Sequence, residues 1–232
     1  MIKLSNVILL LGVGLFSQIT MATTRATVFW FDELEAGVDP VQMRYLVSAN
    51  YLRIDNGDSK ADFILFDSDK KMIYSVNHAD KTILVIRNSN WKKPTYDFST
   101  DVVQAPLEGA PIISGKQVQG YKVTVDGEVC TNIQFIPGMY QNEMQIFKNY
   151  QITLSSQQIS NLANTPEHMK TPCFKLDVVY NEGSYYDLGM PVHEWHNRGY
   201  AKYLKEYKAQ NVPEVLFKLP AGYKQYSVGV TQ

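Results

Sequence analysis

The sequence predicts a mainly β protein of the α+β class, in which a large antiparallel sheet is covered by short helices. Residues 51–86 contain four apolar clusters separated by Asp, Asn, Gly and Lys, as in short strands joined by turns. The connections are shorter than the roughly dozen residues that a parallel crossover needs, so each strand turns back beside the previous one. A helix-like segment then lies between two runs of strands. The four predicted strands are Tyr51–Ile54, Phe63–Phe66, Met72–Val76 and Thr82–Ile86.

Further strands precede and follow this meander. Before it, the pattern predicts Ala26–Asp32 and a long strand at Met43–Ile54 that bends across a curved sheet. After it, strands are predicted at Thr95–Val103, Gly120–Val125 and Val129–Ile136. The last two flank Asp126-Gly127, a strong signal for a type I′ hairpin turn. We therefore expect Lys122–Val125 to pair with Thr131–Phe135.

The segment Gln141–Ala163 changes to apolar spacings of three and four residues, which favour helix. Ile152-Thr153-Leu154 interrupts this pattern, and Ser155 or Ser156 provides a cap for a second helix. We therefore predict two short helices joined by an extended link and ending before Pro166, in preference to one uninterrupted helix.

The C-terminal part returns to strand-like patterns. Strands are predicted at Phe174–Tyr180 and Tyr185–Asn197, and a closing segment ends at Leu219–Tyr223. Tyr200–Ala209 has helical propensity, but its aromatic spacing also suits an outer strand, and strand is favoured.

The N-terminus is typical of a secretory signal peptide. Met1–Lys3 is a short basic region, Val7–Phe16 is apolar, and Thr20-Met21-Ala22 offers small residues for cleavage. The alternatives are cleavage after Ala26 or a transmembrane anchor, but the apolar run is shorter than the roughly 20 residues that span a bilayer. We expect a signal peptide at 1–22 and one domain at 23–232. The mature protein is then exported, most simply to the periplasm, and soluble without a lipid anchor.

Charge limits the expected partners, and the cysteine content predicts a disulfide. The formal net charge is −1 and the two signs are interspersed, so neither nucleic acid nor an anionic membrane is expected as a partner. Cys130 and Cys173 are the two cysteines. In an exported chain a lone pair of cysteines usually forms a disulfide, which we favour over a catalytic thiol.

The order of these segments resembles the LolA/LolB superfamily of periplasmic lipoprotein carriers, as an uncharacterised branch of it. The resemblance covers nearly all of the predicted mature chain and rests on YLRID, FILFD, MIYSVNH, KTILVI, the helical insert, GMPVHEW and VLFKLPAGY. It implies a strongly curved, incomplete antiparallel barrel with helices over its open side. The residues expected to share the sheet face that lines an apolar cavity are Phe29, Phe31, Tyr45, Val47, Phe63, Leu65, Ile83 and Val85.

Such a cavity implies a carrier for a lipid or a lipoprotein acyl chain, because burial stabilises an acyl chain by about 0.8 kcal/mol per methylene. The alternative is a non-enzymatic envelope interaction or structural protein whose protein partner is unknown. A hydrolase or metal-dependent enzyme is a third hypothesis.

No catalytic residue, metal site or cofactor is predicted. His193 and His196 flank Glu194, but on a strand residues i and i+3 point to opposite faces and do not share a metal. His78 and His168 are interpreted as turn and loop residues. Five aspartates are interpreted as turn residues in preference to a calcium site, because they lack the spacing of an EF-hand. They are Asp55, Asp58, Asp62, Asp67 and Asp69.

Overall fold

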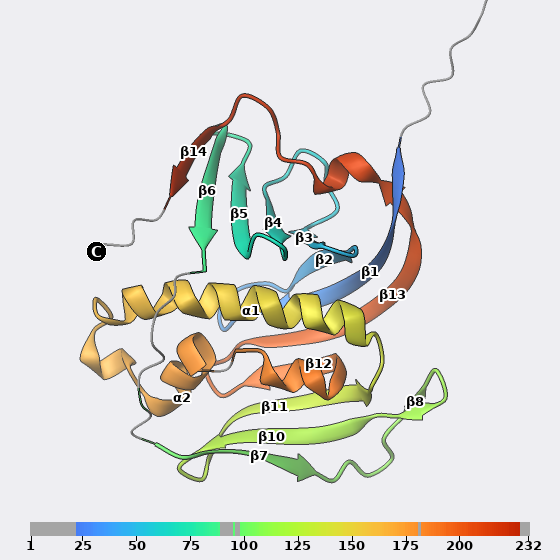
Figure 1. Ribbon diagram of the computed structural model, residues 1–232. Helices are drawn as coiled ribbons and strands as arrows, with labels where there is room; N and C mark the ends of the chain where they lie inside the picture. Colours follow the sequence, from blue (N-terminus) through green and yellow to red (C-terminus); the bar gives the residue numbers. More distant parts are fainter. Residues whose placement is uncertain (1–21, 89–94, 96–97, 181, 228–232) are drawn as a thin grey trace, which may run out of the picture.

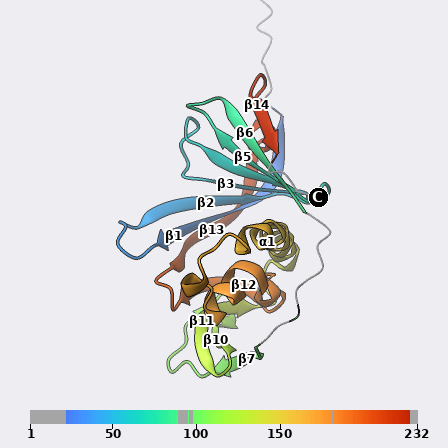
Figure 2. The same cartoon turned by 90° about the vertical axis from the view of Figure 1, so that its left-hand side faces the viewer.

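The computed structural model describes residues 22–88, 95, 98–180 and 182–227. The predicted signal peptide lies outside the described residues, apart from Ala22. Twelve strands form one curved sheet that does not close into a barrel, and helix α1 crosses one of its faces (Figures 1 and 2). The predicted mainly β fold, with an incomplete barrel and covering helices, is confirmed. Among the described residues, no helix is both long and apolar enough to cross a membrane.

The strand order in this sheet is β14-β6-β5-β4-β3-β2-β1-β13-β12-β11-β10-β7. The first half of the chain supplies β1 (Thr23–Leu34), β2 (Val41–Val47), β3 (Tyr51–Asp55), β4 (Phe63–Asp67), β5 (Met72–Asn77), β6 (Thr82–Arg87) and β7 (Thr100–Ala105). The second half supplies β10 (Gln119–Val125), β11 (Glu128–Pro137), β12 (Gly189–His196), β13 (Ala201–Pro213) and β14 (Lys224–Ser227). A separate small hairpin joins β8 (Ile112–Ile113) to β9 (Lys116–Gln117).

The meander β3–β6 is confirmed, with every neighbouring pair antiparallel. The predicted long strand Met43–Ile54 is wrong, because the chain reverses within it. The amide of Ser48 donates to the carbonyl of Tyr51 at 2.9 Å, and β2 and β3 then pair with Leu46 opposite Arg53. A bend was predicted where a tight turn forms.

The β10–β11 hairpin is confirmed. Asp126 and Gly127 both have positive φ, 49° and 84°, as a type I′ turn requires. The expected pairing of Lys122–Val125 with Thr131–Phe135 is correct only for Lys122 and Val123, because a bulge after Val123 places Val125 opposite Glu128. Strand β7 forms the outer edge beside β10 and begins at Thr100. The predicted start of that strand at Thr95 falls in a stretch that the structure describes only in part.

The C-terminal strands join the two halves of the sheet. The predicted strand Tyr200–Ala209 is confirmed as part of β13, but its expected outer position is wrong, because β13 pairs with β1 on one side and with β12 on the other. After the turn η4 (Glu214–Phe217), β14 lies parallel to β6, whereas all the other strand pairs in the described part of the sheet are antiparallel. The predicted closing segment Leu219–Tyr223 therefore precedes the last strand.

Helix α1 runs uninterrupted from Gln141 to Leu162, so the prediction of two helices with an extended link is wrong. Thr153, in the interrupting triplet, is fully buried and its hydroxyl donates to the carbonyl of Asn149 at 2.9 Å. Because this hydrogen bond satisfies the buried hydroxyl, Thr153 does not break the helix, which is stabilised by packing against the sheet. Met144 and Phe147 are buried in that interface.

The predicted strand Phe174–Tyr180 is also wrong. Thr171 caps the short helix α2 (Pro172–Lys175) by accepting from the amide of Phe174 at 3.2 Å, and a π-helical turn η2 (Leu176–Tyr180) follows. Pro172 suits the first turn of a helix, where its missing N–H is no loss. The predicted disulfide between Cys130 and Cys173 is confirmed and ties this turn to β11.

The predicted strand Tyr185–Asn197 is correct only in its second part. Its start forms the 3-10 turn η3 (Ser184–Asp187), and β12 begins at Gly189. Gly189 has φ +146°, and a Cβ at this position would overlap the carbonyl oxygen of Ile136. This close approach of two backbones requires glycine.

We expect Gly189→Ala to lower the free energy of unfolding by about 2–3 kcal/mol, through backbone strain and displacement of β11. Gly37→Ala is the matched control, since Gly37 also has positive φ (+82°) but a Cβ there meets nothing within 4 Å. Urea denaturation compares the two variants. Equal losses in both would show that the contact with Ile136 has no effect.

The sheet has an apolar core on each face of its β1–β6 half. One core packs against α1 and the other lies under η4 and the segment leading to β14. Strand residues alternate between the two faces. The α1-facing core includes Phe29, Phe31, Tyr45, Val47, Leu52, Phe66 and Ile73. The opposite core includes Val28, Leu46, Phe63, Leu65, Val76, Ile83, Val85 and Phe217.

Candidate functional site

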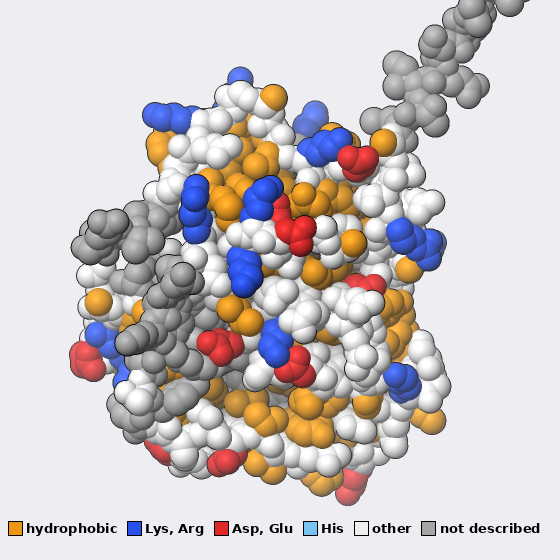
Figure 3. All heavy atoms as spheres, viewed as in Figure 1, with side chains coloured by type: hydrophobic (Ala, Val, Ile, Leu, Met, Phe, Trp, Pro, Cys, Tyr) orange, Lys and Arg blue, Asp and Glu red, His pale blue; other side chains and the backbone are white. Residues whose placement is uncertain are grey.

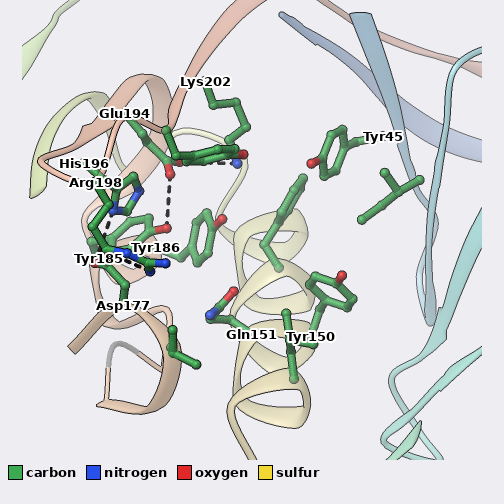
Figure 4. A pocket seen from close by; sticks show the side chains of 15 residues that line it. Tyr45, Tyr150, Gln151, Asp177, Tyr185, Tyr186, Glu194, His196, Arg198 and Lys202 are labelled. Carbon is green, nitrogen blue, oxygen red and sulfur yellow. Dashed lines mark hydrogen bonds and ion pairs between the residues drawn. The ribbon is translucent and has the colours of Figure 1, made fainter. Parts of the chain in front are cut away.

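A cavity of about 300 Å³ lies between α1, η3 and the sheet face formed by β2, β3, β12 and β13 (Figure 4). One part of its wall is apolar and aromatic, and another carries charged side chains. Its lining consists of Tyr45, Ile54, Phe147, Tyr150, Gln151, Leu154, Asp177, Val178, Tyr185, Tyr186, Glu194, His196, Arg198, Tyr200 and Lys202.

Two opposite charges lie buried in this wall. Glu194 on β12 and Lys202 on β13 are register partners, only 2% and 6% exposed. Lys202 Nζ lies 3.4 Å from Glu194 Oε1, longer than the roughly 2.7–2.9 Å of a charge-assisted hydrogen bond. Tyr185 donates to the other oxygen, Oε2, at 3.2 Å, while Oε1 accepts no hydrogen bond from any described residue. The carboxylate of this cavity-lining residue thus retains a buried acceptor beside Lys202.

Lys202 keeps its positive charge in this site. Burial is the largest single influence and lowers its pKa, but the Glu194 carboxylate together with Tyr186, Tyr45 and Tyr200 holds the pKa well above the usual lysine value. The ammonium also lies 4.9 Å from the ring centre of Phe31 and 5.4 Å from that of Tyr45, where ring faces attract a cation.

Buried tyrosines surround the charged pair. Burial raises the pKa of Tyr150 to about 12, and it also raises the pKa of Tyr45, Tyr185, Tyr186 and Tyr200. All five hydroxyls are therefore protonated at neutral pH and able to donate. The Tyr45 hydroxyl donates to Glu33, and the Tyr185 hydroxyl to Glu194.

A second polar cluster lies in the part of the wall formed by η2 and the β12–β13 turn. His196 Nδ1 and the Thr131 hydroxyl each lie within 3.2 Å of Asp177 Oδ1, and Arg198 lies 3.8 Å from Asp177 Oδ2. Thr131 also meets His196 at Nδ1. A nucleophile–histidine–carboxylate relay needs both ring nitrogens, one for each partner. Because Thr131 and Asp177 meet the same nitrogen, the cluster does not have that geometry.

The apolar wall comes from three elements. Phe147, Tyr150 and Leu154 are presented by α1, Ile54 by β3 and Val178 by η2. The side chains of α1 recur at spacings of three and four, so one helix face forms this wall. The disulfide beside η2 holds that turn against the sheet.

The eight residues expected to share one face are divided between the two faces of the sheet. Phe29, Phe31, Tyr45 and Val47 lie in the α1-facing core, and of the eight only Tyr45 lines the cavity. The other four, Phe63, Leu65, Ile83 and Val85, lie in the opposite core. The expectation assumed that these residues of all four strands point to the same face of the sheet. In the structure, the residues of β4 and β6 (Phe63, Leu65, Ile83 and Val85) point to the face opposite to that of Tyr45 and Val47.

The histidines follow the strand geometry expected of β12. His193 stacks between Trp195 and Tyr203, with ring centres 4.4 and 4.0 Å away, whereas His196 lines the cavity. Burial lowers the pKa of His193. His78 packs against Phe63 and Tyr223, and His168 lies in the short 3-10 turn η1 (Glu167–Met169).

The five aspartates interact with protein groups. Asp55 binds Arg44 and Arg53, Asp67 binds Lys70, and the other three accept from Lys60, His78 or Asn50. Within the described residues, no group of three or more His, Cys, Asp or Glu side chains is arranged to hold a metal ion.

The Glu194–Lys202 pair was not predicted from the sequence. A usable signal was present, because Asn197-Arg198-Gly199 has the composition of a turn between two predicted strands. A hairpin about Arg198 places residue 194 opposite 202. That both side chains are buried depends on α1 and η3, which the sequence does not align with this hairpin.

Comparisons with known proteins identify no family. No family model matches the chain, and no curated protein matches it. Two solved structures of PNGF-II, in space groups C2 and P21, share 8% identity with TM-scores of 0.41 and 0.43. They cover 89% and 88% of this chain but 31% and 32% of their own, so the chain spans about a third of their length. This similarity does not assign a function.

Proposed function

We propose that this protein binds or carries a small ligand whose apolar part lies in the cavity between α1 and the sheet. The observation that carries the proposal is the cavity itself. Its volume of about 300 Å³ is at the lower end of the range for small-molecule sites, and it combines aromatic walls with a few convergent polar groups. A ring or a short chain fits this description better than a whole lipid.

The energetics suit reversible carriage. Burying about eight carbons contributes roughly 6 kcal/mol, against which stand the costs of immobilising the ligand. Because those costs are at least about 4 kcal/mol, the apolar part alone leaves a net affinity weaker than about 1 mM. Release therefore needs no chemical step, and the protein is proposed to be non-enzymatic.

We place this activity in an oxidising compartment, most simply the periplasm, after export. The disulfide between Cys130 and Cys173 supports this location, because such bonds persist outside the reducing cytosol. The resemblance to LolA/LolB carriers agrees with it. Acidic and basic side chains are interspersed on the face drawn in Figure 3, without a large patch of one sign.

Filling the cavity should weaken ligand binding. We expect Leu154→Trp to weaken binding of the apolar fluorophore 1-anilinonaphthalene-8-sulfonate by about tenfold or more, since the new ring occupies the ligand volume. Gln145→Trp adds the same ring to an exposed position of α1 outside this cavity and should leave binding unchanged.

Native mass spectrometry of the unmodified protein, purified without denaturation, complements this titration by showing whether a ligand stays bound. A protein that is always empty and binds the fluorophore equally in both variants would contradict the proposal. An interaction role in the envelope would then be favoured.

A further inference from the structure

The charged part of the cavity contains a buried acceptor that no described residue satisfies. Glu194 Oε1 is buried and accepts no hydrogen bond from the described part of the chain, and its ion pair with Lys202 is long at 3.4 Å. Buried carboxylate oxygens are normally paired, and an unpaired one is costly. The site therefore favours a ligand that brings a hydrogen-bond donor to Glu194.

Simple ligand classes fit this part of the site poorly. A neutral acyl chain removes water from the pair and leaves Oε1 without a donor. A plain cation approaches Glu194 but is repelled by Lys202, and a plain anion has the reverse problem. Only a ligand with both signs close together complements the two side chains.

The surrounding groups favour the same class. The hydroxyls of Tyr186 and Tyr200 remain protonated and line the cavity near Lys202. On the other side, the rings of Phe147 and Tyr150, together with Leu154, form an apolar wall for a side chain. The charged pair Glu194–Lys202 and the apolar wall of α1 thus line the same small cavity (Figure 4).

We propose that the ligand is a zwitterion with an apolar side chain, namely an α-amino acid that is aromatic or aliphatic. Its ammonium donates to Glu194 Oε1, its carboxylate accepts from Lys202, and its side chain lies against α1. This inference rests on the proposed binding function and specifies its ligand.

The decisive test compares three probes that share a phenyl ring. Isothermal titration of the unmodified protein with L-phenylalanine, 2-phenylethylamine and 3-phenylpropionate varies only the charged groups. We expect L-phenylalanine to bind about tenfold or more tightly than either single-charge analogue, since each analogue lacks one charge-assisted contact. Equal or weaker binding of L-phenylalanine would overturn the inference.

A neutral variant tests which residues carry the preference. Replacing the pair together, Glu194→Gln with Lys202→Met, avoids leaving one buried charge alone. It should bind all three probes within about threefold of one another, because neither sign is then recognised. The matched control, Asp32→Asn with Lys205→Gln, removes an Asp–Lys ion pair between β1 and β13, at 3.2 Å, and should keep the preference. A preference that persists in the neutral variant would place recognition elsewhere.

The two proposals fail differently. If 1-anilinonaphthalene-8-sulfonate binds in the cavity but L-phenylalanine shows no preference, only the zwitterion inference fails. If neither binds, the proposed binding function fails with it.

Discussion

The variant Asp55→Asn is expected to lose about 3–5 kcal/mol of unfolding free energy, because it leaves buried guanidinium groups without their counter-charge. Asp55 is completely buried on β3 and binds Arg44 through two hydrogen bonds of 2.8 and 3.0 Å. It also accepts from Arg53 at 2.5 Å and from the amide of Gly57 at 2.9 Å.

Arg53 makes the loss severe. Its side chain is 5% exposed, its guanidinium lies 3.6 Å from the ring centre of Phe63, and it donates to the carbonyl of Leu216 at 3.0 Å. These contacts hold the guanidinium between β3 and η4, so it does not turn to water when Asp55 is neutralised.

Urea denaturation measures the effect, with Asp58→Asn as the control. Asp58 is exposed and accepts from backbone in the neighbouring turn, so its replacement should cost no more than about 1 kcal/mol. A loss in Asp55→Asn as small as in the control would show that the network is not stabilising.

The same network predicts the pH dependence of stability. Burial raises the pKa of Asp55, but the hydrogen bonds from Arg44 and Arg53 outweigh burial and lower it below the usual value. A lowered pKa in the folded state contributes stability above the unfolded pKa of about 3.9, which is lost as pH falls through the folded pKa. The stability difference between the unmodified protein and Asp55→Asn should therefore shrink below about pH 4. A constant difference down to pH 2 would contradict the assignment.

Removing the disulfide is expected to have the second large effect. Cys130 and Cys173 are separated by 43 residues, and closing a loop of this length stabilises by about 4 kcal/mol on the chain-entropy model. The double variant Cys130→Ala with Cys173→Ala should lose about this amount in urea denaturation, and the unmodified protein should approach it under reducing conditions.

This loss should extend to the ligand site. The disulfide holds α2 and η2, and η2 contributes Asp177 and Val178 to the cavity. We expect weaker binding of 1-anilinonaphthalene-8-sulfonate in the double alanine variant at temperatures where it remains folded. Unchanged stability after reduction would show that the buried cluster of Val125, Leu176 and Val179 holds this region without the bond.

Local sequence patterns predicted the structure correctly where a short turn or a dipeptide signal determined how two neighbouring strands pair. The β3–β6 meander followed from short polar turns, and the β10–β11 hairpin from Asp126-Gly127. In such segments the strand partner is the next segment along the chain, so local chemistry is enough to determine both structure and pairing.

Predictions failed where distant packing overrode propensity. Ile152-Thr153-Leu154 continues α1 because the helix packs against the sheet and Thr153 bonds to Asn149. Phe174–Tyr180 reads as a strand but is helical, since Thr171 caps it and the disulfide holds it against β11. Both segments carry β-branched residues, whose preference for strand is weak enough to be reversed by burial.

The candidate site shows the same division. The sequence by itself determined the β3–β6 meander, the β10–β11 hairpin turn and the pairing of the two cysteines, because each depends on near neighbours or on a single partner choice. Only the tertiary structure decided which face each strand turns to α1. It also decided that Glu194 and Lys202, polar residues of an ordinary hairpin, are buried beside five tyrosines. Burial is a property of elements far apart in the chain, and it makes this pair a candidate recognition site rather than a surface ion pair.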